Sequence, residues 1–598
     1  MCGFVGIFGK HNKDRIRDEL RNSLKLISHR GPDNKKIIQI NNLSVGFSRL
    51  SIQDLSNSAN QPMYSEDKRY VILFNGEIYN FKKIKKDMLK KDKNLKFVSS
   101  SDTEVLLNLY ILKGHKMLNE LEGIFSLIIF DKKKNYIFIS RDRFGLKPLY
   151  YILHKQNFIF SSEMKGFLPL IQKLQIPWKI NKNLVLEYLT YRCNVGENTL
   201  IDKVRKFKNG NYAFFNSKGK FKTFSFFSPK YNSFNNKKIK INSKNIQNYI
   251  KKLDNLFSKS IDKQMISDAP LGICLSGGLD SSLILNYAAS KVDYPIQNFH
   301  INFKTTRKKI FSEKKYAKTV AKKYKCKLKI IDYDLNKYIK DFKDAVWFND
   351  EPLSIPHAPA LCRLSKIASR KVKVLLAGEG ADDIFAGYNM HKKNPRYLKE
   401  IDLYAKDKDM IRILNYGYRN FNPQRIALQK KIKRDKVNSL IIYNLDSKLS
   451  HLLNRLDKMS MAGSIEARAP FLDEKLFEFS KSLPTNLKIQ NKSSKYIIKK
   501  LSEKFFAKKF IYRKKIGFSM PLNEWMKKSK FKKFFLDILL DPLTLSRGIY
   551  NPKELTKLIK TFNKGSDRDK NSYANKIWVL VNFELWMRMF IDKNLKIN

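Results

Sequence analysis

The feature that most limits what this chain can fold into is a Ser/Gly-rich loop between a short apolar run and a helical pattern. The run is Leu271–Leu275, the loop is Ser276–Ser282 with the sequence Ser-Gly-Gly-Leu-Asp-Ser-Ser, and the helical pattern begins at Leu283. Glycines let backbone N–H groups approach a phosphate closely, and a helix N-terminus favours an anion. A strand, loop and helix in this order predict one unit of a mostly parallel α/β sheet with a phosphate-binding edge.

A second loop of the same kind carries acidic side chains. Strands are predicted over Phe299–Phe303 and Lys373–Ala377, and the second strand runs directly into Gly378-Glu379-Gly380-Ala381-Asp382-Asp383. Ligands of open α/β sheets bind beyond the carboxyl ends of the strands, so we expect both loops to meet there. Each loop taken alone is also compatible with an ordinary turn. The chain has no G-x-x-x-x-G-K-[ST] pattern, which disfavours a P-loop NTPase.

The first 200 residues are predicted to be rich in strands. The apolar, Gly-containing run Cys2–Gly9 predicts a buried strand. Helical patterns near 14–28 and 103–112 interleave with four more predicted strands, Tyr70–Phe74, Ile124–Phe130, Tyr136–Ser140 and Leu149–Ile152. The stretch 216–245 is rich in Lys, Asn and Ser and is predicted to be a linker.

Cys2 becomes a potential nucleophile if Met1 is removed. Its thiol would then lie beside a free α-amine, whose ordinary pKa of about 7.7–8.0 lets it accept the thiol proton near neutral pH. The thiolate is the reactive form of cysteine, and an adjacent base produces it. A single cysteine near a terminus is more commonly structural, so the neighbouring segments decide between the two interpretations.

Two of these segments have both a structural and a chemical interpretation. Asn75-Gly76 follows a predicted strand and is compatible with a hairpin turn, or with an oxyanion hole made of a side-chain amide and a backbone N–H. Ser101–Glu104 is compatible with a helix N-cap, or with a carboxylate that binds a substrate ammonium.

Taken together, the N-terminal segments resemble the glutaminase domain of the class II glutamine amidotransferases, which have an N-terminal-nucleophile fold. The likeness follows the family's order and covers Cys2-Gly3, Arg30–Asp33, Arg49–Ile52, Asn75–Glu77 and Ser101–Glu104. The resemblance implies that Cys2 attacks the side-chain amide of glutamine and that Asn75 and Gly76 stabilise the oxyanion.

The same resemblance implies a set of glutamine-binding residues. Arg49 would pair with the α-carboxylate, for which a guanidinium has the right geometry, and Glu77 and Asp102 would hold the α-ammonium. The complete predicted set is Arg49, Leu50, Ser51, Ile52, Gln53, Asn75, Gly76, Glu77 and Asp102.

The later loops resemble those of ATP-pyrophosphatase-type enzymes, which cleave ATP between its α and β phosphates. Combined with the glutaminase segments, they resemble the glutamine-hydrolysing asparagine synthetases over roughly residues 1–530. Supporting segments are Asp457–Met461, Glu466–Asp473 and Ser494-Lys495-Tyr496. Cys274 and Ala377 depart from the family's common residues, an aliphatic residue and a serine, which could signal a divergent branch.

This resemblance implies the remaining site residues. Glu379 would accept a proton from attacking ammonia, Lys495 would neutralise charge on the α-phosphate, and Glu379 and Asp382 would line the aspartate site. Asp280 and Asp382 would bind Mg²⁺. The implied ATP-binding residues are Cys274, Ser276, Gly277, Gly278, Leu279, Asp280, Ser281, Ser282, Ile301, Ala377 and Gly378.

We therefore predict an α/β and α+β protein. An N-terminal-nucleophile αββα sandwich would occupy 1–215, a linker 216–245, a parallel-sheet ATP-pyrophosphatase-like domain 246–530, and a helical extension 531–598. The expected reaction is ATP-dependent amidation of aspartate to asparagine with ammonia from glutamine, through β-aspartyl-AMP. The alternative is the same architecture acting on another carboxylate, such as a sugar acid or a peptide.

Composition limits the partners and the compartment. The net charge of +63 invites a nucleic-acid interpretation, but the lysines are scattered along the chain, so we expect small-molecule substrates and no nucleic acid. Five widely spaced cysteines argue against a disulfide scaffold and a zinc site. The sequence shows no secretion signal and no membrane-length apolar run, so we expect a cytoplasmic enzyme without membrane contact. A homodimer is possible for such an enzyme.

Overall fold

The N-terminal half of the computed structural model is a sandwich of two six-stranded antiparallel sheets. The structure describes residues 2–306, 312–392, 407–432, 436–518, 520–564 and 567–592. In spatial order, the first sheet consists of β10 (Arg205–Lys206), β8 (Tyr150–His154), β9 (Asn157–Ser161), β1 (Cys2–Gly9), β3 (Leu43–Arg49) and β2 (Asn34–Ile40). The second consists of β12 (Phe221–Ser225), β11 (Asn211–Asn216), β7 (Tyr136–Arg141), β6 (Gly123–Asp131), β5 (Tyr70–Ile78) and β4 (Met63–Tyr64).

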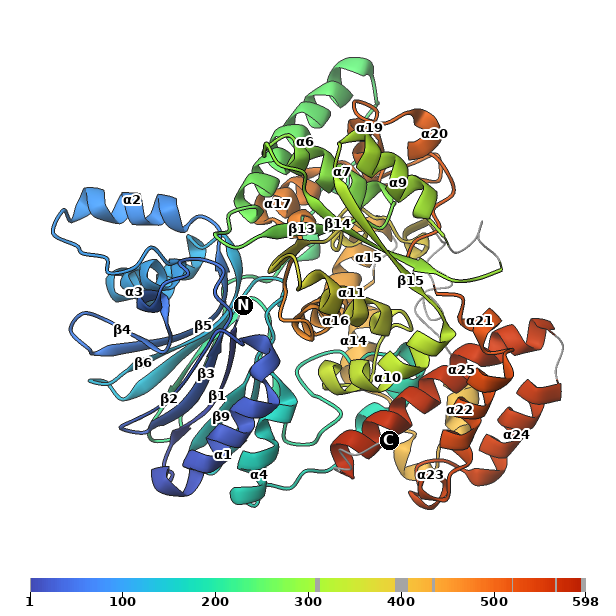
Figure 1. Cartoon of the computed structure of the whole chain (residues 1–598), viewed down its shortest axis with the longest axis horizontal. Helices are drawn as coiled ribbons and strands as arrows, with labels where there is room; N and C mark the ends of the chain where they lie inside the picture. Colours follow the sequence, from blue (N-terminus) through green and yellow to red (C-terminus); the bar gives the residue numbers. More distant parts are fainter. Residues whose placement is uncertain are drawn as a thin grey trace.

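Helices cover both outer faces of this sandwich (Figure 1). Aromatic and aliphatic side chains such as Phe4, Phe8, Phe130 and Phe158 fill the space between the sheets. α1 (Lys13–Leu26) and α4 (Leu168–Lys173) pack on the first sheet, and α2 (Phe81–Lys91) and α3 (Asp102–Lys113) pack on the second. These layers form the predicted αββα sandwich. A further helix, α5 (Val185–Tyr191), follows β9 in the chain.

The second half is built on a five-stranded parallel sheet. Its spatial order is β15 (Lys327–Tyr333), β14 (Gln297–Phe303), β13 (Leu271–Cys274), β16 (Val374–Leu376) and β17 (Glu466–Arg468). One face packs on α6 (Ser243–Gln264) and α7 (Leu279–Ala289), and the other on α10 (Leu335–Asn349) and α11 (Ala358–Ala368). Burial on both faces agrees with the predicted parallel α/β architecture.

The remaining described elements of this half are short or helical. A two-stranded hairpin joins β18 (Ile489–Gln490) and β19 (Ser493–Ser494). The helices are α9 (Lys314–Lys323), α12 (Ala381–Ile384), α13 (Asp407–Ile413), α14 (Pro423–Lys430), α15 (Lys436–Asn444), α16 (Ser450–Met461), α17 (Glu474–Ser482), α18 (Thr485–Lys488), α19 (Tyr496–Ser502), α20 (Lys508–Ile511), α21 (Leu522–Trp525), α22 (Ser529–Leu540), α23 (Pro542–Ser546), α24 (Pro552–Lys564) and α25 (Asp567–Trp586).

Most predicted elements are present, with shifted ends and a few omissions. The predicted strand over Tyr70–Phe74 continues to Ile78, so Asn75-Gly76 lies inside β5 and the hairpin-turn interpretation is wrong. The predicted linker 216–245 contains β12, which pairs with β11, and its last residues belong to α6. In the parallel sheet, strands β15 and β17 were not predicted, and in the sandwich strands β2, β4 and β9 to β12 were not predicted. No comparison tests the domain limits as such, which stay a prediction.

The two halves meet across an interface that contains buried charges. Arg30 Nη1 lies 2.8 Å from Asp457 Oδ2, and both side chains are fully buried. Lys165 Nζ lies 2.7 Å from Asp350 Oδ1, also without exposure. Removing one partner of such a pair leaves an uncompensated buried charge at a cost of about 3–5 kcal/mol. The interface therefore fixes how the two halves lie relative to each other.

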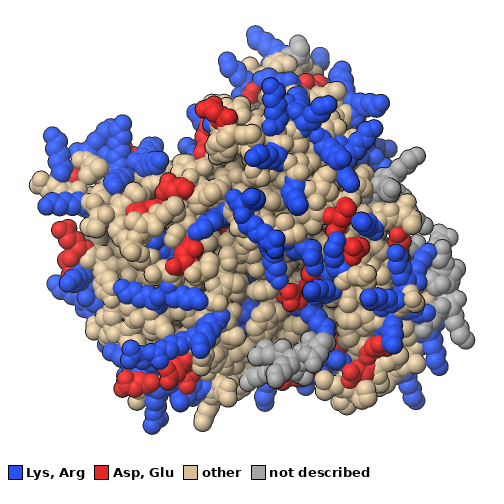
Figure 2. Space-filling view, viewed as in Figure 1, with Lys and Arg blue, Asp and Glu red and all other residues tan. Residues whose placement is uncertain are grey.

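Positively charged side chains are not gathered into a single patch on the visible face. Figure 2 shows Lys and Arg over the whole of this face, with Asp and Glu interspersed among them. This distribution agrees with the scattered lysines of the sequence. Among the described residues, no helix combines the length and the apolar character that a membrane span requires.

Candidate active sites

The first candidate site surrounds Cys2 at the start of β1. Cys2 is buried and pairs in register with Arg49 of β3. Its backbone N–H donates a hydrogen bond to Asn75 Oδ1 at 3.0 Å. The structure therefore brings together three predicted residues that are separated by up to 73 positions in the chain.

Charges around Cys2 act on its thiol in both directions. Burial raises the pKa of Cys2 above its ordinary value of 9.0, while the charge of the amino terminus and of Arg49 lowers it. Glu466, which belongs to the other half of the chain, raises this pKa further. The thiol is consequently protonated near neutral pH, and a base must take its proton before it can act as a nucleophile.

Gly76 is required by the close approach of two strands. A Cβ atom at this position would lie 2.1 Å from the carbonyl oxygen of Ile124 and 2.7 Å from Phe125 Cα. These are backbone atoms of the paired strand β6 and cannot move away like a flexible side chain. Both predicted oxyanion donors, Asn75 and Gly76, thus lie in one rigid strand next to Cys2.

Glu77 and Asp102 form a buried acidic pair next to this strand. Asp102 Oδ2 accepts a hydrogen bond from the Ile78 N–H at 2.9 Å, and burial raises the pKa of Asp102 to about 6. Burial and the charge of Asp102 raise the pKa of Glu77 well above its ordinary value, although Arg468 opposes this. Ser101 is the N-cap of α3, as its structural interpretation predicted, and this role leaves the Asp102 carboxylate beside β5.

Arg49 is engaged by the loop that follows it. Its Nη1 atom donates to the Ser56 carbonyl at 2.7 Å and to Asn60 Oδ1 at 2.9 Å, and its Nη2 donates to the carbonyls of Gln53 and Asp54. The predicted residues Leu50, Ser51, Ile52 and Gln53 are buried in this loop. These contacts order the loop around the guanidinium.

The second candidate site begins at the Ser/Gly-rich loop between β13 and α7. Gly278 is the N-cap of α7, and its N–H donates to Ser276 Oγ at 3.1 Å. Ser276 Oγ also lies 2.9 Å from Ser281 Oγ. Gly277 has a φ of +87°, which a residue with a Cβ rarely adopts. Hydrogen bonds of its own serines thus fix the loop conformation at a helix N-terminus, a position that suits an anion.

The two predicted Mg²⁺ ligands of this site, Asp280 and Asp382, converge on one lysine. Lys495 Nζ lies 2.6 Å from Asp280 Oδ1 and 2.9 Å from Asp382 Oδ1, and Lys515 Nζ lies 2.5 Å from Asp382 Oδ2. The charges of Lys495 and Lys515 outweigh burial and lower the pKa of Asp382. A Cβ on Gly378 would lie 3.3 Å from Asp280 Cβ, so the two loops touch as predicted.

Glu379 lies at the same sheet edge and has a basic partner that was not predicted. Arg455 of α16 forms an ion pair with Glu379 and lies 2.7 Å, through Nη1, from His357 Nε2. Burial and the charge of Glu379 raise the pKa of the Cys274 thiol to about 12. Two further predicted nucleotide contacts are buried nearby: Ile301 on β14 and Ala377 directly after β16.

Sequence reasoning missed four charged or titratable groups of the second site: His357, Arg455, Arg513 and Lys515. Arg513 donates to the Gly277 carbonyl at 2.6 Å and pairs with Glu313 at 2.7 Å. In a chain with 118 Lys and Arg, spacing alone does not distinguish these residues from surface charges. A signal was available for Arg455, which lies two positions before the supporting segment Asp457–Met461.

The donor chemistry of Asp280 and Asp382 fits magnesium. Mg²⁺ prefers oxygen ligands and is commonly bound by one or two carboxylates together with substrate phosphates. Asp280 lies in the first turn of α7 and Asp382 in the first turn of α12, and both carboxylates pair with Lys495. No group of three or more His, Cys, Asp or Glu side chains with metal-binding geometry occurs among the described residues.

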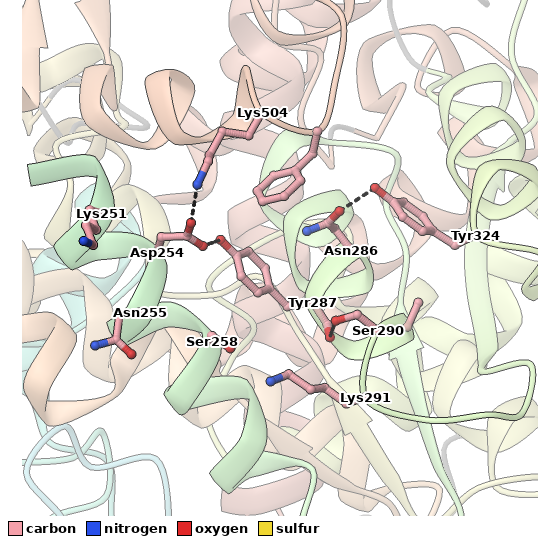
Figure 3. A pocket seen from close by; sticks show the side chains of 12 residues that line it. Lys251, Asp254, Asn255, Ser258, Asn286, Tyr287, Ser290, Lys291, Tyr324 and Lys504 are labelled. Atoms are coloured by element: carbon pink, nitrogen blue, oxygen red, sulfur yellow. Dashed lines mark hydrogen bonds and ion pairs between the residues drawn. The ribbon is translucent and has the colours of Figure 1, made fainter. Parts of the chain in front are cut away.

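A cavity of about 680 Å³ lies away from both candidate sites, between α6 and α7. Figure 3 shows Lys504 and Tyr287 directed towards Asp254, which pairs with both. None of the predicted site residues lines this cavity. Its acidic side chain is already neutralised by neighbouring groups, so the cavity carries no part of the chemistry argued below.

Comparison with known proteins agrees with this two-site geometry. The model of the glutamine amidotransferase domain matches residues 1–226, and the asparagine synthase model matches residues 252–588. A Bacillus subtilis protein named asparagine synthetase [glutamine-hydrolyzing] 1 is 29% identical, over 99% of this chain and 97% of its own. A Methanocaldococcus jannaschii protein named putative asparagine synthetase [glutamine-hydrolyzing] 2 is 32% identical, over 67% of this chain and 80% of its own.

Among solved structures, a glutamine phosphoribosylpyrophosphate amidotransferase from B. subtilis matches with a TM-score of 0.30 and 14% identity, over 56% of this chain and 81% of its own. That likeness is too low to add to the fold described above. The family models cover both halves, and each covers the part of the chain that holds one candidate site. The chain therefore belongs to the asparagine synthase family, as an enzyme of the glutamine-hydrolysing class that joins a glutamine amidotransferase domain to a synthase domain.

Proposed function

We propose that this enzyme converts aspartate to asparagine with ATP and with ammonia released from glutamine, through β-aspartyl-AMP. One observation carries the proposal. Asp280, Asp382 and Lys495 converge at the sheet edge that also holds Glu379, in a chain that places Cys2 against Asn75 in its other half. Names of the relatives support the choice of aspartate.

In the glutaminase half, Cys2 is the proposed nucleophile once Met1 is removed. The freed α-amine would take the thiol proton, and Asn75 Oδ1, which already accepts from the Cys2 nitrogen at 3.0 Å, would orient this amine. The sulfur attacks the amide carbon of glutamine. The C–N bond then breaks and ammonia leaves with the proton, and water hydrolyses the thioester to glutamate.

The developing oxyanion needs donors that are fixed before the reaction. The Asn75 side-chain amide and the Gly76 N–H are proposed for this role. Glu77 and Asp102 would bind the α-ammonium of glutamine, and Arg49 its α-carboxylate. The Arg49 guanidinium already binds loop carbonyls, so the carboxylate would join or replace these contacts.

In the synthase half, a β-carboxylate oxygen of aspartate attacks the α-phosphorus of ATP. The bond from this phosphorus to the bridging oxygen breaks, and pyrophosphate leaves with the electron pair. Lys495 would offset charge on the phosphates. The Ser276–Ser282 loop would bind them once the N–H groups of Ser276 and Gly278 exchange their present serine acceptors for phosphate oxygens. Mg²⁺, held by Asp280 and Asp382, supplies further neutralisation of phosphate charge when bound.

Ammonia then attacks the acyl carbon of the adenylate, and the bond to AMP breaks. Glu379 is proposed to accept the proton that ammonia loses in this step. The ion pair with Arg455 holds the Glu379 carboxylate in one position at this sheet edge. Ammonia released into bulk water is protonated and can no longer attack. We therefore propose that ammonia passes inside the protein, between halves that the interface holds in a fixed arrangement.

The test is pyrophosphate release from ATP with Mg²⁺ and glutamine, measured with and without aspartate. Release that depends on aspartate, together with asparagine detected by mass, supports the proposal. Glutamine hydrolysis without aspartate-dependent pyrophosphate would contradict aspartate as acceptor. The search would then move to the alternative, a sugar acid or a peptide carboxylate.

A further inference from the structure

A side chain from the synthase half lies inside the proposed glutamine site of the other half. Arg468, the last residue of β17, is completely buried, and its Nη2 lies 3.0 Å from Glu77 Oε2. The two residues are 391 positions apart in the chain. The Arg468 guanidinium also lies 5.7 Å from the centre of the Tyr79 ring, two residues beyond Glu77.

Every nitrogen of this guanidinium is used. Nε donates to Glu466 Oε1 at 2.6 Å, and Nη1 donates to the carbonyls of Gln264 and Ile266 at 2.8 and 2.6 Å. Burial opposes the charge, but Glu466 and Glu77 outweigh it and raise the pKa of Arg468. Four partners in fixed directions require the planar fork of an arginine, which a lysine does not reproduce.

The contact leaves one oxygen of Glu77 available. Glu77 Oε1 is buried and has no hydrogen-bond partner among the described residues. A buried carboxylate oxygen without a partner is costly, and a ligand ammonium would satisfy it. Arg468 therefore occupies one oxygen of Glu77 and leaves the other for the substrate.

The backbone of Arg468 belongs to the second site. Its carbonyl accepts a hydrogen bond from the Ala377 N–H at 2.9 Å, and β17 pairs with β16 in the register Leu376 to Arg468. Ala377 directly precedes the Gly378-Glu379 loop. The guanidinium that holds Glu77 is thus anchored to the strand edge that carries the acceptor loop.

We infer that Arg468 is a positioning residue of the glutamine site, which fixes Glu77 to receive the α-ammonium of glutamine, so that the synthase domain completes this site. The inference rests on the proposed role of Glu77. It predicts that changing Arg468 weakens glutamine binding through Glu77 and leaves the rate of the Cys2 chemistry largely unchanged.

The experiment is a double-mutant cycle on glutamine hydrolysis by the full chain. Arg468→Lys keeps the charge but loses the fork, and we expect it to raise KM for glutamine about tenfold or more with a much smaller change in kcat. In an E77Q background, the same substitution should give no further rise. Thermal unfolding checks that each variant folds cooperatively.

Arg143→Gln is the matched control. Arg143 also bridges the two halves, with Nη2 3.1 Å from Glu474 Oε1, and it donates to the carbonyls of Leu118 and Leu121. Losing this interface arginine should leave KM for glutamine within about twofold, because no contact joins it to Glu77.

Two results would overturn the inference. One is a folded R468K variant with an unchanged KM for glutamine, and the other is an equal rise in KM with and without Glu77. The proposed function fails separately, if the wild-type enzyme hydrolyses glutamine but makes no amide of aspartate. In that case the cycle still decides the role of Arg468, since it measures hydrolysis alone.

Discussion

The ammonium of Lys495 lies 2.6 and 2.7 Å from the two carboxylate oxygens of Asp280. Lys495 is 4% exposed and adopts a φ of +51°, which is uncommon for a residue with a Cβ atom. The backbone therefore takes an unfavourable conformation that delivers this ammonium to the predicted phosphate site. Such strain is commonly retained where function requires it.

Lys495→Met should abolish the activation of the acceptor. We expect aspartate-dependent pyrophosphate release to fall by about a hundredfold or more, because a preorganised charge at the phosphates is lost. Glutamine hydrolysis at Cys2 should persist. Lys499→Ala is the control, since Lys499 of α19 donates to Ser493 of β19 and forms no ion pair with Asp280 or Asp382. Comparable pyrophosphate release by K495M and wild type would contradict the role of Lys495.

Cys2→Ala should separate the two half-reactions. The variant should lose asparagine formation from glutamine but keep it with added ammonium, because the synthase site is built from other residues. Both reactions can be followed by the mass of the product. Cys326→Ala, at a half-buried cysteine outside both sites, should keep both reactions. Glutamine-dependent synthesis by C2A would exclude Cys2 as the nucleophile.

The pH dependence of glutamine hydrolysis should report Asp102. Its pKa is raised by burial to about 6, so the carboxylate takes up a proton as pH falls through this value and loses the charge that would bind the ammonium. We expect kcat/KM for glutamine to fall below about pH 6. Asp102→Asn should lower kcat/KM at every pH and remove this acidic limb.

The same group affects stability with a defined sign. The folded state binds the Asp102 proton more tightly than the unfolded chain, whose ordinary pKa is 3.8. Its contribution therefore favours folding at low pH and declines as pH rises from about 4 to about 6. If D102N leaves the acidic limb of the kcat/KM profile for glutamine unchanged, a group other than Asp102 controls that profile.

Gly76→Ala should destabilise the glutaminase half. Its Cβ would lie 2.1 Å from a backbone oxygen, so the strands must separate, at a cost of about 2 kcal/mol or more. Thermal unfolding of this half should shift down by about 4–8 °C. Gly46→Ala is the matched control, because its Cβ would meet only the Leu24 side chain at 3.4 Å. Equal midpoints for the two variants would contradict this account.

Apolar runs and loop composition predicted single strands and the parallel α/β unit because those signals are local, whereas the αββα sandwich was implied by the resemblance to the class II amidotransferases. The Ser276–Ser282 loop lies at the start of α7, and the αββα order of the first half is present. β17 could not be predicted in this way, since it has three residues, two of which are charged. The two charged residues of β17, Glu466 and Arg468, pair with Lys147 and Glu77. These partners lie far away in the chain, and no local pattern reveals them.

The site residues show the same difference between local sequence signals and tertiary contacts. Cys2, Asn75, Asp280 and Asp382 were found because they belong to recognisable segments, and the structure brings each set together. Arg455 and Arg468 form ion pairs with Glu379 and Glu77, which the sequence did not predict although Arg468 lies in the supporting segment Glu466–Asp473. Such pairing depends on tertiary structure and not on sequence spacing.

The central claim is that one chain transfers the amide nitrogen of glutamine to aspartate. The most direct measurement supplies glutamine labelled with ¹⁵N in its amide, together with aspartate, ATP and Mg²⁺, and determines the mass of the amide product. The account predicts asparagine that carries the label, formed in step with pyrophosphate. Labelled ammonia and glutamate in the absence of labelled asparagine would contradict it.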